Sequence, residues 1–203
     1  MRHPLVYRIL CGMIGWGTVG IIYQFTGQFS EHATKLMPSW LDKNIAYSVQ
    51  GIWLYLSFFL FIPCGYLLAE RNKIVPLMLS MQLCALLSGI IYLLFPTTMD
   101  YPNTLEHGLA QQLVLQLVAI DTQQNLLPSL HVSLTLLVLY TLWSKTHKIR
   151  TAGYFVWALL ICFSVIQLRR HLVIDVISGI ITATMAWYVV DKIQLRRQEN
   201  YHE

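Results

Sequence analysis

The sequence predicts an all-α membrane protein, a bundle of about six transmembrane helices. Of its 203 residues, 56% are hydrophobic and 12% are charged, and that charged fraction is about half the share in an ordinary soluble domain. The apolar residues also form runs long enough to supply the roughly 20 residues of a membrane-spanning helix. Because these runs lack alternation of polar and apolar residues, the strands of a membrane β-barrel are excluded.

Six apolar runs follow one another along the chain, and all are free of charge over most of their length. We expect helices at about residues 10–25, 47–69, 74–95, 129–143, 152–168 and 172–190. Six spans of about 20 residues take up about 120 positions, so a single membrane-embedded domain over residues 1–203 is expected. The first run lacks a convincing cleavage site after its basic start, and we expect it to remain as a span.

The connection at residues 96–128 has its own pattern. It contains three carboxylates and neither Lys nor Arg, as expected of an outer loop. Within residues 105–120, Leu109, Leu113, Leu117 and Ile120 recur at helical spacing, which is typical of an amphipathic helix at the membrane interface. We therefore expect an outer loop that carries one interfacial helix.

The distribution of positive charge predicts the orientation. Lys and Arg concentrate on the cytoplasmic side of membrane proteins. With a cytoplasmic N-terminus, ten of the 14 Lys and Arg residues lie inside and four lie outside, namely Lys35, Lys43, Arg169 and Arg170. We expect both termini in the cytoplasm and an inner or plasma membrane. The net charge of +4 forms no basic stripe, so the expected partner is the lipid bilayer and not a nucleic acid.

Polar residues interrupt the apolar pattern at two places, both on the expected outer side. They stand at the starts of the fourth and sixth helices and include Asn125, Ser129, His131, Arg169, Arg170, His171 and Asp175. Ionisable side chains within a span are costly and indicate a functional site. Glu106, His107 and Asp121 have no spacing that favours a site, and we expect them to be solvated loop residues.

The second of these places predicts a reactive imidazole. His171 and Asp175 are four residues apart, so on a helix the carboxylate can accept a hydrogen bond from one imidazole nitrogen. The other nitrogen is then available as a general base, a metal ligand or a nucleophile toward phosphorus. The helix start at Ser129 favours an anion, and His131 can donate a proton to a leaving oxygen. The four cysteines lie in apolar runs without metal-ligand spacing, which indicates neither a zinc site nor a disulfide.

Both places resemble the signatures of a known family. Residues 125–133, NLLPSLHVS, resemble the second signature of the type 2 phosphatidic acid phosphatase superfamily, often PSLH in its membrane branches. Residues 170–179, RHLVIDVISG, resemble its third signature, His-x-x-x-Asp followed by a hydrophobic pair and Gly. Val165 stands where that signature often has Arg, and residues 95–102 do not match the first signature. Sphingolipid synthase-like branches also relax these basic positions.

The resemblance implies a metal-independent lipid phosphatase that needs no cofactor and acts on a membrane lipid phosphate at the outer leaflet. By position, His171 would be the nucleophile that forms a phosphohistidine, and Asp175 would orient it. His131 would be the acid for the leaving group, and Ser129 would bind phosphate. Three further residues beside the motifs are expected to contact the substrate: Asn125, Arg169 and Arg170.

Two other functions remain open from the sequence. The same residues could move a phospho-head group to a second lipid alcohol, as a phosphotransferase does. The polar face could also serve a non-enzymatic lipid-binding or transport protein. His171 and Asp175 could then form a structural pair at the end of a span, and Ser129 could serve only as a helix N-cap.

Overall fold

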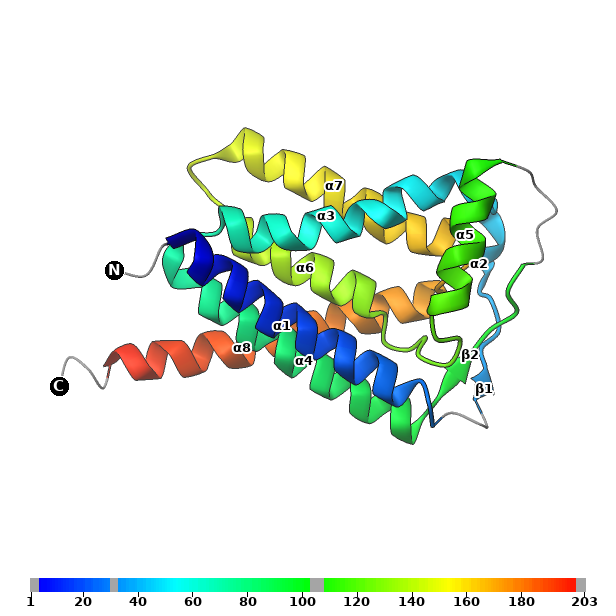
Figure 1. The fold of residues 1–203 in the computed structure, drawn as a ribbon, viewed down its shortest axis with the longest axis horizontal. Helices are drawn as coiled ribbons and strands as arrows, with labels where there is room; N and C mark the ends of the chain where they lie inside the picture. Colours follow the sequence, from blue (N-terminus) through cyan, green and yellow to red (C-terminus); the bar gives the residue numbers. More distant parts are fainter. Residues whose placement is uncertain (1–3, 30–32, 103–107, 200–203) are drawn as a thin grey trace.

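Six helices run along one another and form most of the molecule (Figure 1). The structure is a computed structural model and describes residues 4–29, 33–102 and 108–199. The six helices are α1 (Pro4–Thr26), α3 (Ile52–Leu68), α4 (Ile74–Leu94), α6 (Leu130–Leu142), α7 (Lys148–Gln167) and α8 (Val173–Glu199). They overlap the six expected helices, although α1 begins six residues earlier than expected, α3 begins five residues later and α8 ends nine residues later. The predicted all-α fold class is confirmed.

Two short strands and two short helices gather at one end of the bundle, opposite the end where α1 begins and α8 finishes (Figure 1). These elements are β1 (Thr34–Lys35), α2 (Trp40–Asn44), β2 (Thr97–Thr98) and α5 (Leu109–Ile120). The two strands pair in parallel, and Thr97 also bridges to Asn125. The long connections after α1 and after α4 are therefore joined to each other.

Helix α6 differs from its neighbours in length and burial. Within residues 4–29, 33–102 and 108–199, five helices are long and apolar enough to cross a membrane, and α6 is not among them. Its 13 residues extend over roughly 20 Å, which is less than the roughly 30 Å of a hydrocarbon core. Ten of these residues are buried, because α3, α4, α7 and α8 pack around the helix. The expected fourth span is thus a short central helix.

Small residues allow the other helices to approach α6 closely. A Cβ atom on Gly65 of α3 would lie 2.7 Å from a methyl of Val138, and one on Gly179 of α8 would lie 2.7 Å from the Ser129 carbonyl oxygen. The Ser133 hydroxyl lies 2.9 Å from the carbonyl oxygens of both Ser129 and Gly179. Contacts of this kind stabilise helix pairs in membranes, where apolar surface alone gives little preference for protein over lipid.

Helix α5 lies across the end of the bundle at which the strands gather (Figure 1). Its buried face includes Ala110, Val114 and Leu117, which pack with residues of the 3₁₀ turn Val49–Gly51 and of α3. Leu109 and Ile120 are exposed, so the buried face differs from the stripe expected from the sequence. The helix begins at Leu109, and residues 105–107 of the expected helix lie outside the described residues. Its placement at a membrane interface remains a prediction.

Replacement of Gly179 with Ala is expected to destabilise the protein. The new methyl group meets backbone, which cannot move aside as a flexible side chain can, and overpacking of this kind costs about 1–3 kcal/mol. Gly153 of α7 is the matched control, since a Cβ atom there meets nothing within 4 Å and Gly153→Ala gains roughly 1 kcal/mol of helix propensity. Thermal unfolding in detergent measures both. Equal or higher stability of Gly179→Ala would contradict the close contact.

Candidate active site

The first motif starts α6 and is tied to α8. Ser129 is the N-cap residue, and its hydroxyl oxygen accepts the N–H of Val132 at 3.4 Å. The backbone N–H of Ser129 donates to the carbonyl oxygen of Asp175 at 3.1 Å. Just before it, the carbonyl oxygen of Pro128 accepts the hydroxyl of Tyr92. The start of α6 is therefore fixed against the first turn of α8.

The second motif lies in the turn that ends α7 and starts α8. Arg169 has a left-handed backbone, with φ of 50°. The N–H of Arg169 donates to the carbonyl oxygen of Ile166 at 2.9 Å, and that of Arg170 donates to Val165 at 3.0 Å, the pattern of a Schellman cap. This position favours Gly, and a side chain there costs about 1–2 kcal/mol. The cap turns the chain so that His171 follows directly at the start of α8.

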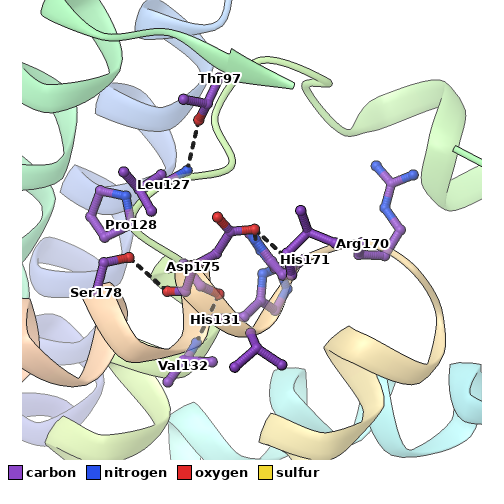
Figure 2. Close-up of polar contacts among 12 residues, drawn as sticks. Thr97, Leu127, Pro128, His131, Val132, Arg170, His171, Asp175 and Ser178 are labelled. Carbon is purple, nitrogen blue, oxygen red and sulfur yellow. Dashed lines mark hydrogen bonds and ion pairs between the residues drawn. The ribbon is translucent and has the colours of Figure 1, made fainter. Parts of the chain in front are cut away.

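His171 and Asp175 form the expected pair, drawn in Figure 2. Imidazole Nδ1 lies 3.5 Å from carboxylate Oδ2, which also accepts the N–H of Leu172 at 2.7 Å. This separation is at the long limit for a hydrogen bond, and Nδ1 has no hydrogen-bond partner among the described residues. Asp175 is fully buried, and its Oδ1 atom has no hydrogen-bond partner among the described residues. The carboxylate thus faces one nitrogen of His171, while Nε2 is the nitrogen on the far side of the ring.

His131 lies next to His171 inside an aromatic enclosure. Its ring centroid is 4.5 Å from those of both Tyr55 and Phe58, and 6.2 Å from that of His171. Atom Nδ1 lies 3.5 Å from the hydroxyl oxygen of Tyr55, and the buried Nε2 atom has no partner among the described residues. Two imidazoles at this separation can both contact one phosphoryl group.

Arg170 forms a buried ion pair with Asp121, just after α5. Its Nη2 and Nε atoms lie 2.7 and 3.2 Å from Oδ2 of Asp121, and its guanidinium carbon lies 4.7 Å above the ring centre of Tyr101. The Tyr23 hydroxyl donates to the other carboxylate oxygen. Burial favours the neutral carboxyl, but the guanidinium and the Tyr23 hydroxyl outweigh it and hold the pKa of Asp121 below its ordinary value. Burial likewise opposes the charge on Arg170, yet Asp121 raises its pKa.

The remaining predicted residues lie at the edge of this arrangement. In Figure 2 the guanidinium of Arg170 points away from His171. Arg169 donates from Nη2 to the Ile45 carbonyl oxygen at 2.6 Å, and its buried Nη1 has no hydrogen-bond partner among the described residues. Asn125 donates from Nδ2 to the Tyr23 carbonyl oxygen at 2.8 Å. The structure thus brings Ser129, His131, His171 and Asp175 together, while Asn125 and Arg169 contact the surrounding backbone.

The comparison with known proteins covers both motifs. Residues 32–189 match one protein family, the PAP2 superfamily. The chain belongs to the PAP2 superfamily. Since the match includes all of the site residues, the resemblance seen in the sequence is confirmed. No curated protein and no solved structure matches the chain. Membership of the PAP2 superfamily, with the long apolar helices, supports an integral membrane protein with a lipid-related phosphatase or phosphotransferase function.

Asp121 was expected to be a solvated loop residue, and this expectation is wrong. Its side chain is 11% exposed and carries the ion pair with Arg170. The prediction failed because Asp121 and Arg170 are 49 positions apart, and no local spacing reveals a contact of that range. Glu106 and His107 lie outside the described residues.

Asp42 is a further residue that the sequence analysis missed in this PAP2 protein. It is 1% exposed, closes a capping box with Ser39, and accepts the N–H of Val173 at 2.8 Å. Asp42 therefore caps the helix that carries Asp175. The spacing of Ser39 and Asp42 resembles a capping box and is visible in the sequence, but the contact with α8 is not.

The ion pair predicts how stability depends on pH. Because the pKa of Asp121 is lowered by folding, its contribution is fully present above the ordinary Asp value of about 3.9 and is lost as the pH falls through the folded-state value. Asp121→Asn should cost about 3–5 kcal/mol at pH 6, since it leaves a buried guanidinium unpaired. The difference in unfolding free energy from wild type should shrink below about pH 4.

Chemical unfolding in detergent across pH measures this difference. Asp100→Asn is the control, because Asp100 pairs with Lys35 at 2.6 Å with side chains 80% and 53% exposed, and exposed pairs contribute less than about 1 kcal/mol. A cost for Asp121→Asn that grows as the pH falls toward 3 would contradict the assignment.

Proposed function

We propose that the protein is a metal-independent lipid phosphate phosphatase that works through a phosphohistidine on His171. The observation that carries the proposal is the pair of imidazoles of His131 and His171, with ring centroids 6.2 Å apart and with His171 beside a buried carboxylate. Both motifs lie at the end of the bundle opposite the start of α1. With a cytoplasmic N-terminus the site therefore faces the outer leaflet, in an inner or plasma membrane.

The first step transfers the phosphoryl group to the protein. Nε2 of His171 uses its lone pair to form a bond to phosphorus, while the bond from phosphorus to the lipid oxygen breaks. The proton on Nε2 of His131 passes to that oxygen, and the lipid leaves as an alcohol. Asp175 holds the Nδ1 proton of His171 and stabilises the positive charge that develops on the ring.

The second step returns His171 to its starting state. Neutral His131 accepts a proton from water, whose oxygen bonds to phosphorus as the bond from Nε2 of His171 breaks. Inorganic phosphate leaves, and His131 is again protonated on Nε2. One histidine thus serves as acid and then as base, which balances protons over the cycle.

Ser129 and the arginines are proposed to hold the phosphate. The Ser129 oxygen accepts a backbone N–H, so its own hydroxyl proton remains available to a phosphate oxygen. The first amides of α6 add the positive end of a helix dipole. Asp121 occupies the Nε and Nη2 atoms of Arg170, and the guanidinium has five N–H donors in all. Arg169, whose buried Nη1 atom has no hydrogen-bond partner among the described residues, is proposed to add a second positive charge.

A phosphotransferase is the second candidate, and one observation favours it. The cavity beside His131 has a volume of about 230 Å³ and is lined mainly by apolar and aromatic side chains. A lipid alcohol suits such a cavity better than water does, and it would attack the same phosphohistidine. Release of inorganic phosphate from a labelled lipid phosphate indicates hydrolysis, whereas label in a second lipid indicates transfer.

His171→Ala is expected to abolish turnover of a lipid phosphate, because it deletes the nucleophile. His131→Ala should lower kcat by about 10²- to 10⁴-fold through loss of the acid. Asp175→Asn should be less severe than His171→Ala, because the amide oxygen can still accept the N–H of Leu172. Activity should persist in a chelator, because the mechanism uses only side chains. Release of inorganic phosphate from a panel of lipid phosphates measures each effect.

Two matched controls belong to this experiment. His147 and Asp191 are exposed residues at the opposite end of the bundle, so His147→Ala and Asp191→Asn should retain wild-type activity. Trapping of acid-labile phosphate on wild type, and its loss in His171→Ala, tests the intermediate. A fully active His171→Ala protein would favour the lipid-binding or transport function, and activity lost to a chelator and restored by a divalent ion would favour a metal-dependent mechanism.

Substitution of the arginines should weaken substrate binding. Arg169→Gln and Arg170→Gln each remove a charge beside the phosphate, and a charge-assisted hydrogen bond contributes about 1.5–3 kcal/mol, so kcat/KM should fall by at least about tenfold for one of them. Arg170→Gln also leaves Asp121 unpaired, and the double variant with Asp121→Asn separates this effect. Arg150→Gln, at the opposite end of α7, is the control. Unchanged kcat/KM in all arginine variants would exclude both residues as phosphate ligands.

A further inference from the structure

Two adjoining cavities lie between α1 and α3. The first reaches His131 and Asp121, and the second, of about 620 Å³, continues along both helices to Arg8 and Leu67. The cavities share three lining residues, namely Trp16, Gly20 and Phe59. The two cavities are therefore adjacent, and together they are here called the α1–α3 groove, which starts beside His131 of the candidate active site.

The walls of the α1–α3 groove suit a hydrocarbon chain. Its lining residues are mainly apolar or aromatic, and their charged members stand only at the two ends, Asp121 beside His131 and Arg8 at the other end. Arg8 donates to the carbonyl oxygens of Tyr66 and Ala69 at 2.8 and 2.7 Å. The Arg8 guanidinium thus provides hydrogen bonds to free carbonyl groups at the C-terminal end of α3. A polar ligand would find few partners between the two ends, whereas an apolar chain needs none.

Glycines on α1 keep the groove open. A Cβ atom on Gly17 or Gly20 would meet no atom within 4 Å. Gly15, on the other side of the same helix, is used for packing, because a Cβ atom there would lie 2.2 Å from the Tyr66 hydroxyl and 3.2 Å from the backbone of Met78. Helix packing therefore explains Gly15 but not Gly17 or Gly20, which leave space beside α3.

The length of the groove indicates the kind of chain. Between Gly20 and Arg8 the helix rises by roughly 18 Å, which is longer than one leaflet of a hydrocarbon core roughly 30 Å thick. We infer that the α1–α3 groove binds one long hydrocarbon chain of the lipid phosphate whose head group reacts at His171. This inference rests on the proposed function, and it restricts the substrate to lipids with a long chain beside the phosphate.

Gly20→Leu tests the groove without disturbing the helix bundle. Its side chain enters the shared part of the groove, so kcat/KM for dioleoyl phosphatidate in mixed micelles should fall by at least about tenfold. The rate with p-nitrophenyl phosphate, which has no chain, should stay within twofold of wild type. Gly153→Leu is the matched control, because Gly153 is also an exposed helical glycine with nothing within 4 Å and lies outside the groove. An equal effect of Gly20→Leu on both substrates would overturn the inference.

Cross-linking separates this inference from the proposed function. A phosphatidate with a diazirine at the end of one acyl chain is photolysed with wild type, His171→Ala, Gly20→Leu and Gly153→Leu. Adducts are expected on residues 9–13 or 62–67 in all but Gly20→Leu, and excess unlabelled phosphatidate should displace them. If these adducts form but the wild-type protein turns over neither phosphatidate nor p-nitrophenyl phosphate, the proposed function is refuted while chain binding in the α1–α3 groove is supported. Adducts at other residues would refute chain binding in the α1–α3 groove. Adducts that excess phosphatidate does not displace would also refute it, because they would indicate a site occupied by any bilayer lipid.

Discussion

The contact between the start of α6 and the first turns of α8 is the constraint on which the rest of the structure depends. The Ser129 N–H donates to the Asp175 carbonyl oxygen, and Gly179 lets the two backbones approach closely. Each motif alone lies on one helix start, where the cap fixes its local geometry. The contact between the helices converts two local motifs into one arrangement, with imidazoles 6.2 Å apart. A displacement of about 1 Å at this contact would change the distance between the two histidines directly.

Burial of this site requires that its charges be balanced inside the protein. Helix α6 is shorter than a membrane span, so the site lies below the end of the bundle, with α5 across it (Figure 1). An isolated charge there would be expensive. Asp121 forms an ion pair with Arg170. The Asp42 carboxylate accepts a backbone N–H at the start of α8, and the Asp175 carboxylate accepts the N–H of Leu172. The Nε2 atom of His131 remains without a hydrogen-bond partner among the described residues, as expected of an atom that contacts a substrate.

Local signals predicted much of the fold and the centre of the site. The start of α6 was predicted within one residue, because Pro128 and Ser129 mark a helix start. The end of α8 was not predicted, because the helix continues through charged residues after position 190. Hydropathy indicates where a helix leaves the apolar part of the membrane, and this need not be where the helix ends. His171 and Asp175 were paired from their spacing of four. Asp42 and Asp121 were missed because their partners lie 131 and 49 positions away, a distance at which only the folded packing determines contact.

The position of α1 relative to the family match links chemistry to substrate choice. The PAP2 match covers residues 32–189, which include both motifs but none of α1 (Pro4–Thr26). Yet α1 contributes Tyr23, which donates to Asp121, and one wall of the α1–α3 groove. On the proposed function, the matched part carries the phosphoryl chemistry, while α1 contacts the lipid chain. Because Gly17 and Gly20 on this helix make no contact that a Cβ atom would disturb, larger residues there can narrow the groove without altering the histidines. Selectivity for the chain can thus change independently of the reaction.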